Sequence, residues 1–262
     1  MESRKYPFNN STLTIVFGDI VTSTAEVIVS CDDTGISMGG GLSGYLFNVG
    51  GPEIRNDAQK KLPAQLGDVV VSTAGRLQHQ KYVFHSLTIN QEYKEEVYAG
   101  RILNSEEVNR YILQHTVDKC FRLLQALDLH SIAFPCIGAG LAHIPLSQIA
   151  EVMADAISVN LGKTQRTYQV ELYLFDHNRL LKELDYIDMF ENFAVKSALS
   201  RMQLQSVSHS SVDEPLDKGL ASPPVVKRED MNHRVFISYS RKDEQKVAGI
   251  KAVLEEYSIS VW

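Results

Sequence analysis

The chain has few cysteines and no long apolar run. Its three cysteines, Cys31, Cys120 and Cys136, have the spacing of neither a disulfide framework nor a C-x-x-C metal pair. No stretch approaches the ~20 consecutive apolar residues needed to cross a bilayer. The first ten residues lack the apolar segment of a signal peptide. We therefore expect reduced thiols, no metal site, no membrane partner and a cytoplasmic location.

An excess of basic residues is also absent. The chain holds 26 Lys and Arg against 32 Asp and Glu, which gives a formal net charge of -6. A protein that coats nucleic acid needs a basic face, so we expect no nucleic-acid partner. A small anionic ligand remains possible, because a few backbone amides can hold a phosphate without any net positive charge.

Patterns typical of strands and helices alternate along the first 200 residues. Strands are predicted over 12–17, 26–31, 68–72, 81–87, 131–134 and 168–175. Helices are predicted over 42–49, 51–62, 105–127, 146–160 and 178–199. This order favours a three-layer α/β/α domain with a mixed central sheet over residues 12–200. Residues 1–11 are predicted to be an N-terminal tail.

The composition changes after residue 200. Serine and proline accumulate without apolar periodicity over 201–232, which predicts a flexible linker. A strand pattern over 234–239, a helix over 244–257 and a second strand pattern over 258–262 follow. So few elements cannot close a core. Residues 233–262 are therefore predicted to be the β-α-β beginning of another domain.

A run of three glycines follows the strand at 26–31. Gly39, Gly40 and Gly41 carry a large cost in conformational entropy on folding. Such a run is expected only where the backbone needs positive φ or where another group approaches it closely. The run leads into the predicted helix 42–49, where free N–H groups and the helix dipole would favour a phosphate. A sharp turn without a ligand is the alternative interpretation of this run taken alone.

A second loop of small residues, 136–142, joins the strand at 131–134 to the helix at 146–160. It contains Gly138, Ala139 and Gly140. In open α/β sheets ligands bind in the crevice beyond the carboxyl ends of the strands, so the two loops could hold two phosphates from opposite sides. Residues 39–44 also satisfy G-x-G-x-x-G, but the surrounding Rossmann context is missing. Neither loop has the Gly-Lys-Ser/Thr ending of a P-loop.

With these motifs in order, residues 12–190 resemble the macrodomain family. Gly18-Asp19-Ile20 is similar to the family's G-D-I, and residues 27–33 stand where the family has an apolar strand ending in N-A-A-N. Residues 39–41 stand at its first phosphate loop, and residues 133–140 resemble its second. Leu174-Phe175-Asp176 falls at the last strand. The resemblance implies binding of ADP-ribose or a related NAD-derived nucleotide, with no cofactor.

The resemblance also implies roles for single residues. Asp19 would accept a hydrogen bond from the adenine amino group beside the Ile20 backbone, and Phe175 would contact the adenine ring. The loops would hold the diphosphate by their amides, and Ser30 and Asp33 would lie near the distal ribose. The full predicted ligand-binding set is Asp19, Ile20, Ser30, Asp33, Gly39, Gly40, Gly41, Leu42, Ser43, Ile137, Gly138, Ala139, Gly140, Leu141, Phe175 and Asp176.

Two departures from the family pattern concern catalysis. Hydrolytic macrodomains of the mono-ADP-ribosyl class use the second Asn of N-A-A-N and an Asp just after the triple glycine. Those positions are Asp33 and Ser43 here, and Ser43 has no carboxylate to orient a water. The resemblance therefore favours binding over hydrolysis and leaves the catalytic residues unassigned.

The C-terminal residues resemble the beginning of a TIR domain. The resemblance rests on residues 235–240 (VFISYS), Asp243, an amphipathic helix, and residues 259–262 (ISVW). TIR domains self-associate or cleave NAD, and the enzymatic ones need a glutamate from a later part of the domain that this sequence does not contain. We expect a macrodomain–TIR protein that senses a nucleotide in bacterial antiphage or stress signalling. The alternatives are an ADP-ribosyl hydrolase or deacetylase, and a scaffold assembled by TIR–TIR contacts with a vestigial pocket.

Overall fold

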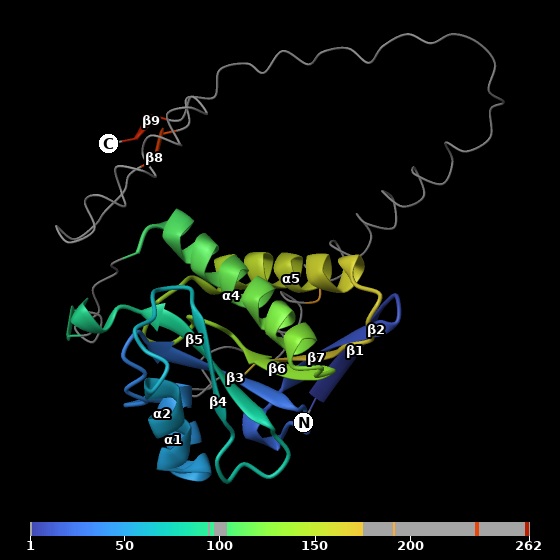
Figure 1. The fold of residues 1–262 in the computed structure, drawn as a ribbon. Coiled ribbons are helices and arrows are strands. Elements are labelled where there is room, and N and C mark those ends of the chain that lie inside the picture. Colours follow the sequence, from blue (N-terminus) through green and yellow to red (C-terminus); the bar gives the residue numbers. More distant parts are fainter. Residues whose placement is uncertain are drawn as a thin grey trace. The chain divides into compact units, whose positions relative to one another are not determined.

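A computed structural model of the protein describes residues 2–93, 95–96, 104–174 and 191, and the backbone of 234–235 and 260–261. The chain divides into two compact units, Met1–Val212 and Asp213–Trp262. The first unit contains a seven-stranded sheet and holds all the side chains discussed below (Figure 1).

The sheet of the first unit is mixed. Its strand order is β1-β2-β7-β6-β3-β5-β4, in which the five inner strands run parallel and the two edge strands, β1 and β4, run antiparallel to their neighbours. The strands are β1 (Glu2–Phe8), β2 (Ser11–Phe17), β3 (Val27–Asp33), β4 (Val69–Thr73), β5 (Tyr82–Ile89), β6 (Ser131–Pro135) and β7 (Gln169–Leu174). The predicted mixed sheet is confirmed.

Helices cover both faces of this sheet. The helices are α1 (Gly41–Gly50), α2 (Pro52–Gln59), α4 (Glu106–Ala126) and α5 (Leu146–Lys163), with short 3-10 turns η1 (Ile20–Thr22) and η2 (Gln91–Tyr93). Helices α4 and α5 lie on one face, and α1 and α2 lie on the other (Figure 1). Each face buries its own apolar cluster, because alternate residues of a strand point to opposite sides. The predicted three-layer α/β/α fold is confirmed.

Helix α4 begins where its sequence predicts. The Ser105 side chain accepts a hydrogen bond from the amide of Val108 at 3.3 Å, and Glu106 and Glu107 occupy the first turn. A side-chain oxygen at this position satisfies one free amide, and acidic residues complement the positive end of the helix dipole. Phe121 of this helix packs against Phe134 of β6, the strand that leads into residues 136–144.

The prediction of an N-terminal tail over residues 1–11 was wrong. Residues 2–8 form β1 and pair antiparallel with β2, with Phe8 opposite Ser11 and a turn at Asn9, whose φ is 51°. Phe8 is buried in the core, and Tyr6 packs against the same cluster. Arg4 shares this face in a period-two alternation, and the charges of Arg4 and Lys5 obscured the strand pattern.

Several predictions fall outside the described residues. They are the helix over 178–199, the linker over 201–232, and most of the segment that resembles a TIR domain. Within the second unit, β8 (Arg234–Val235) pairs in parallel with β9 (Ser260–Val261). Among the described residues, none of the helices has the length and apolar character required to span a membrane.

Candidate ligand cleft

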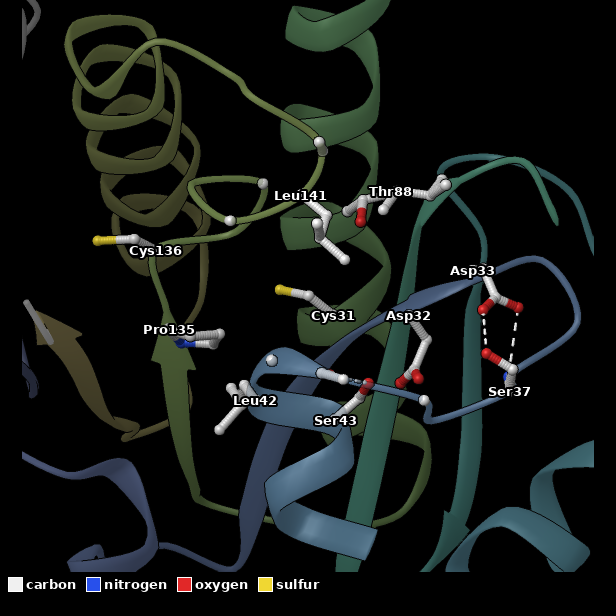
Figure 2. Close-up of a pocket in the computed structure, with 17 residues that line it drawn as sticks. Cys31, Asp32, Asp33, Ser37, Leu42, Ser43, Thr88, Pro135, Cys136 and Leu141 are labelled. Atoms are coloured by element: carbon white, nitrogen blue, oxygen red, sulfur yellow. Dashed lines mark hydrogen bonds between the residues drawn. The ribbon is translucent and has the colours of Figure 1, made fainter. Parts of the chain in front are cut away.

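A cleft opens at the carboxyl ends of three adjacent parallel strands, β3, β5 and β6. It lies between the loop that leads into α1 (the first loop, residues 34–40) and the loop that follows β6 (the second loop, residues 136–144) (Figure 2). The residues lining it are Cys31, Asp32, Asp33, Ser37, Gly39, Gly40, Gly41, Leu42, Ser43, Thr88, Ile89, Pro135, Cys136, Gly138, Gly140, Leu141 and Ala142. The topology thus brings together two loops that lie about a hundred residues apart in sequence.

The first loop presents unpaired backbone amides to the cleft. The first hydrogen bond of α1 runs from the Gly44 amide to the Gly40 carbonyl at 2.9 Å. Among the described residues, the amides of positions 39–43 donate to no protein acceptor. The left-handed φ of Gly41, +56°, turns the chain into the helix here. These amides and the positive end of α1 form an environment suited to an anion.

Asp33 shapes the first loop. One of its oxygens accepts hydrogen bonds from the amides of Gly35 and Ser37, at 2.9 and 3.2 Å, and the other accepts from the Ser37 hydroxyl (Figure 2). A carboxylate bonded to the backbone two residues on is a common way to fix a turn. Asp33 lines the cleft, but its carboxylate is already engaged in holding the loop.

The second loop depends on a glycine with positive φ. Gly138 has φ +82°, and a Cβ added there would lie 2.4 Å from Cδ1 of Ile144. Hydrogen bonds from the His143 amide to Gly140 and from the Ile144 amide to Gly138, at 3.0 and 3.1 Å, close the loop. In the part of the chain that is described, the amides of positions 140–142 donate to no protein acceptor. Free amides from both loops therefore meet at one cleft.

The predicted binding residues do not all line the cleft. It brings together Asp33, positions 39–43, Gly138, Gly140 and Leu141. Ser30 and Ile137 are fully buried outside the lining, and Ala139 is exposed at the edge of the second loop. Phe175 and Asp176 lie outside the described residues.

Asp19 and Ile20 lie next to α1 but outside the cleft lining. The Asp19 carboxylate accepts hydrogen bonds from the Val21 amide at 3.1 Å and from the Tyr45 hydroxyl at 3.2 Å. Its negative charge raises the pKa of Tyr45, because it disfavours the phenolate. Ile20 is buried in the cluster beneath α1. Tyr45, which is 42% exposed, was not predicted from the sequence as a neighbour of Asp19.

Part of the lining was not predicted from the sequence. The missed residues are Cys31, Asp32, Ser37, Thr88, Ile89, Pro135, Cys136 and Ala142. Thr88 and Ile89 end a strand that carries no glycine, so no local motif marked them. Asp32 did carry a signal, because an acidic residue next to a buried strand end is rarely without a partner or a role.

The environment of the two thiols in the cleft disfavours their reactive thiolate form. Burial raises the pKa of Cys31 to about 12, although a hydrogen bond from the Gly138 backbone opposes the shift. Burial likewise raises the pKa of Cys136 to about 12. A thiol with such a pKa is protonated at neutral pH and is a poor nucleophile and metal ligand. Within the described ranges, no three His, Cys, Asp or Glu side chains gather to hold a metal ion.

Comparison with known proteins agrees with this geometry. The profile of the macro domain matches residues 29–153. An uncharacterized protein of Pyrobaculum aerophilum is 32% identical over 144 residues, which cover 53% of this chain and 71% of that protein. An O-acetyl-ADP-ribose deacetylase of Pantoea vagans is 27% identical over 168 residues, covering 63% of this chain and 91% of that protein. An α/β domain with two glycine loops at the carboxyl ends of its parallel strands is the class that this geometry defines. The chain belongs to the macro domain family.

Solved structures show the same fold. The macrodomain of Oceanobacillus iheyensis, solved with ADP, aligns with a TM-score of 0.61 at 24% identity, covering 76% of this chain and 98% of that one. The Trypanosoma brucei macrodomain, solved in complex with ADP-ribose, aligns with a TM-score of 0.55 at 18% identity, covering 69% and 68%.

Proposed function

We propose that the first unit binds ADP-ribose or a close NAD-derived nucleotide in the cleft. The observation that carries the proposal is the convergence of unpaired amides, at positions 39–43, which run from the first loop into α1, and at positions 140–142 of the second loop. Backbone amides of this kind bind phosphate oxygens without a net positive charge, which suits a chain with a formal charge of -6. A diphosphate provides oxygens on two sides and so matches two opposed loops.

The macrodomain structures support the nucleotide part of this proposal. The Oceanobacillus iheyensis protein was solved with ADP, and the Trypanosoma brucei protein with ADP-ribose. In the present chain, Asp19 stands beside α1, where a carboxylate could accept a hydrogen bond from an adenine amino group. Phe175 would then contact the adenine ring, as the resemblance implies.

Calorimetry tests the proposal. The unchanged protein should bind ADP-ribose, and Gly40→Glu should weaken binding by about 100-fold or more, because a carboxylate would face the diphosphate. The φ of Gly40 is -176°, an extended conformation open to any residue, so the backbone tolerates the change. Gln125→Glu adds the same charge on the exposed surface of α4 and should leave affinity unchanged. Absence of ADP-ribose binding by the unchanged protein would reject the proposal.

A second candidate is hydrolysis of an ADP-ribose ester. It is favoured by the relatives named O-acetyl-ADP-ribose deacetylase, among them the Pantoea vagans protein. Opposing it, Ser43 supplies no carboxylate and Asp33 is engaged in the first loop. Release of acetate from O-acetyl-ADP-ribose, measured by mass spectrometry and lost in Asp33→Ala while the fold persists, would establish it. If the unchanged protein releases no more acetate than the Asp33→Ala protein, hydrolysis is rejected and binding is left as the function.

The C-terminal residues extend the proposal to signalling. We propose that 12–200 is the nucleotide-binding domain, 201–232 a linker, and 233–262 the beginning of a TIR domain in a cytoplasmic antiphage or stress response. Binding in the cleft would then shift how the TIR domains associate. In a chain carrying the complete C-terminal domain, ADP-ribose should change the mass measured by light scattering, and Gly40→Glu should abolish the change. Self-association that changes neither on addition of ADP-ribose nor in the Gly40→Glu variant would indicate a scaffold with a vestigial pocket.

A further inference from the structure

Asp32 is a buried carboxylate with one oxygen unused. Its side chain is fully buried, and its Oδ2 accepts hydrogen bonds from the Ser30 hydroxyl at 2.7 Å and from Nδ1 of His85 at 2.8 Å. Its Oδ1 has no hydrogen-bond partner among the described residues. Leaving a buried carboxylate oxygen unpaired is costly, so such an atom calls for a donor.

The cleft is where that donor can come from. Asp32 lines it together with Gly39, Gly40 and Ser43, and Figure 2 shows its carboxylate directed toward the side of the cleft where Ser43 lies. The Ser43 hydroxyl is not that donor, because it donates to the Gly40 carbonyl at 3.1 Å.

The neighbours of Asp32 hold it in one orientation. His85 lies opposite Ser30 on the adjacent strand, and its second ring nitrogen, Nε2, lies 2.8 Å from the Ser72 hydroxyl. Ser30, Ser72 and His85 are all fully buried. With both ring nitrogens engaged, the imidazole cannot turn away, so Oδ2 stays occupied and Oδ1 stays available. Asp33, the next residue, has its carboxylate engaged in the loop, so the two acidic residues have different tasks.

We infer that Asp32 accepts a hydrogen bond through Oδ1 from a sugar hydroxyl of the bound nucleotide and so selects ligands that carry a second sugar. This inference rests on the proposed function. A carboxylate repels phosphate, so the diphosphate must lie toward the free amides, and the ligand group beside Asp32 must be a neutral donor. In the resemblance to the macrodomain family, Asp32 takes the place of the second alanine of N-A-A-N, so this acceptor is a feature of the present chain.

The test compares two ligands in two proteins. Asp32→Ala should weaken ADP-ribose binding by about 10- to 100-fold, the range for a hydrogen bond to a charged group. It should change ADP binding by less than about twofold, because ADP lacks the second sugar. Asp32→Asn, which keeps the size of the side chain, should also lose selectivity for ADP-ribose over ADP. Asp128→Ala removes an aspartate that is 79% exposed and should alter neither affinity.

The outcomes separate this inference from the proposed function. If the unchanged protein binds ADP-ribose and both Asp32 variants keep its affinity, the inference is overturned and nucleotide binding stands. Equal weakening of ADP and ADP-ribose also overturns it, because Asp32 would then only support the cleft. If the unchanged protein binds no ADP-ribose, both proposals fall.

Discussion

Two glycines of the second loop, Gly138 and Gly140, differ in how strongly the backbone requires glycine at their positions. Gly138 has φ +82° and no room for a Cβ beside Ile144, whereas an added Cβ at Gly140 would meet nothing within 4 Å. Gly138→Ala should therefore cost about 2 kcal/mol or more of unfolding free energy. Gly140→Ala should change it by less than about 0.5 kcal/mol. Denaturant unfolding of both variants checks this, and equal costs would show that the loop is not constrained at Gly138.

The thiols of the cleft make a second prediction at this scale. With pKa values of about 12, only about one in ten thousand of the Cys31 and Cys136 thiols is ionised at pH 8. Both should resist alkylation by iodoacetamide in the folded protein and react once it is unfolded. Mass spectrometry of the two cysteines over time measures this. Rapid modification of either residue in the native protein would contradict the account of the cleft.

At the scale of elements, Glu26 joins the amino ends of three strands, β3, β5 and β6. Its carboxylate accepts hydrogen bonds from Lys81 at 2.7 Å and from the amides of His130 and Ser131, at 2.6 and 3.2 Å. Burial alone would raise its pKa, but the hydrogen bonds from Lys81 and the two amides, with the charge of Lys81, hold the pKa below the ordinary value of a glutamate. A lowered carboxyl pKa in the folded state stabilises the protein above the unfolded value, and this is lost as pH falls through the folded pKa.

Glu26→Gln tests that linkage. At neutral pH the variant should be less stable by about 1–3 kcal/mol, the range for hydrogen bonds to a charged group. As the pH falls from neutral through the lowered pKa of Glu26, the stabilities of the two proteins should converge, because the carboxyl of the unchanged protein takes up a proton. Urea unfolding across this range gives the difference. A difference that stays constant with pH would mean that the charge of Glu26 is not what stabilises the strands.

The packing of β1, where the sequence predicted a tail, can be tested by two substitutions. Phe8 is 8% exposed in the core, so Phe8→Ala should cost about 3 kcal/mol of stability. Lys5 lies on the exposed side of the same strand, and Lys5→Ala should cost less than about 0.5 kcal/mol. Thermal unfolding compares them. Equal and small losses of stability in both variants would mean that Phe8 is not packed in the core and that residues 1–11 form the tail predicted from the sequence.

The elements that sequence predicted best are those with one dominant signal. The strand at 131–135 is apolar after its first residue, Ser131, and α4 carries a serine cap and an acidic first turn, so both were located within a residue or two. The strand at 2–8 was missed because its inward positions include Arg4, which breaks the apolar alternation. Local patterns report burial only when the inward side chains are apolar.

At the scale of the whole domain, sequence could locate the two loops but not what faces them. The glycines identified positions 39–41 and 138–140 because glycine is needed where the backbone turns or approaches closely. Asp32, Thr88 and Cys136 enter the cleft only through the neighbouring order β6-β3-β5, which no local pattern encodes. Ser30 shows the reverse case, because the family resemblance implied a place near the distal ribose, whereas the structure places Ser30 outside the cleft lining with its hydroxyl donating to Asp32.

The central claim is that backbone amides of two loops bind one diphosphate, and amide chemical shifts test it most directly. On titration with ADP-ribose, the largest shifts in a ¹H–¹⁵N spectrum should fall on residues 39–43 and 140–142, and ADP should move the same signals. Saturating binding whose shifts lie elsewhere, with these amides unmoved, would contradict the account.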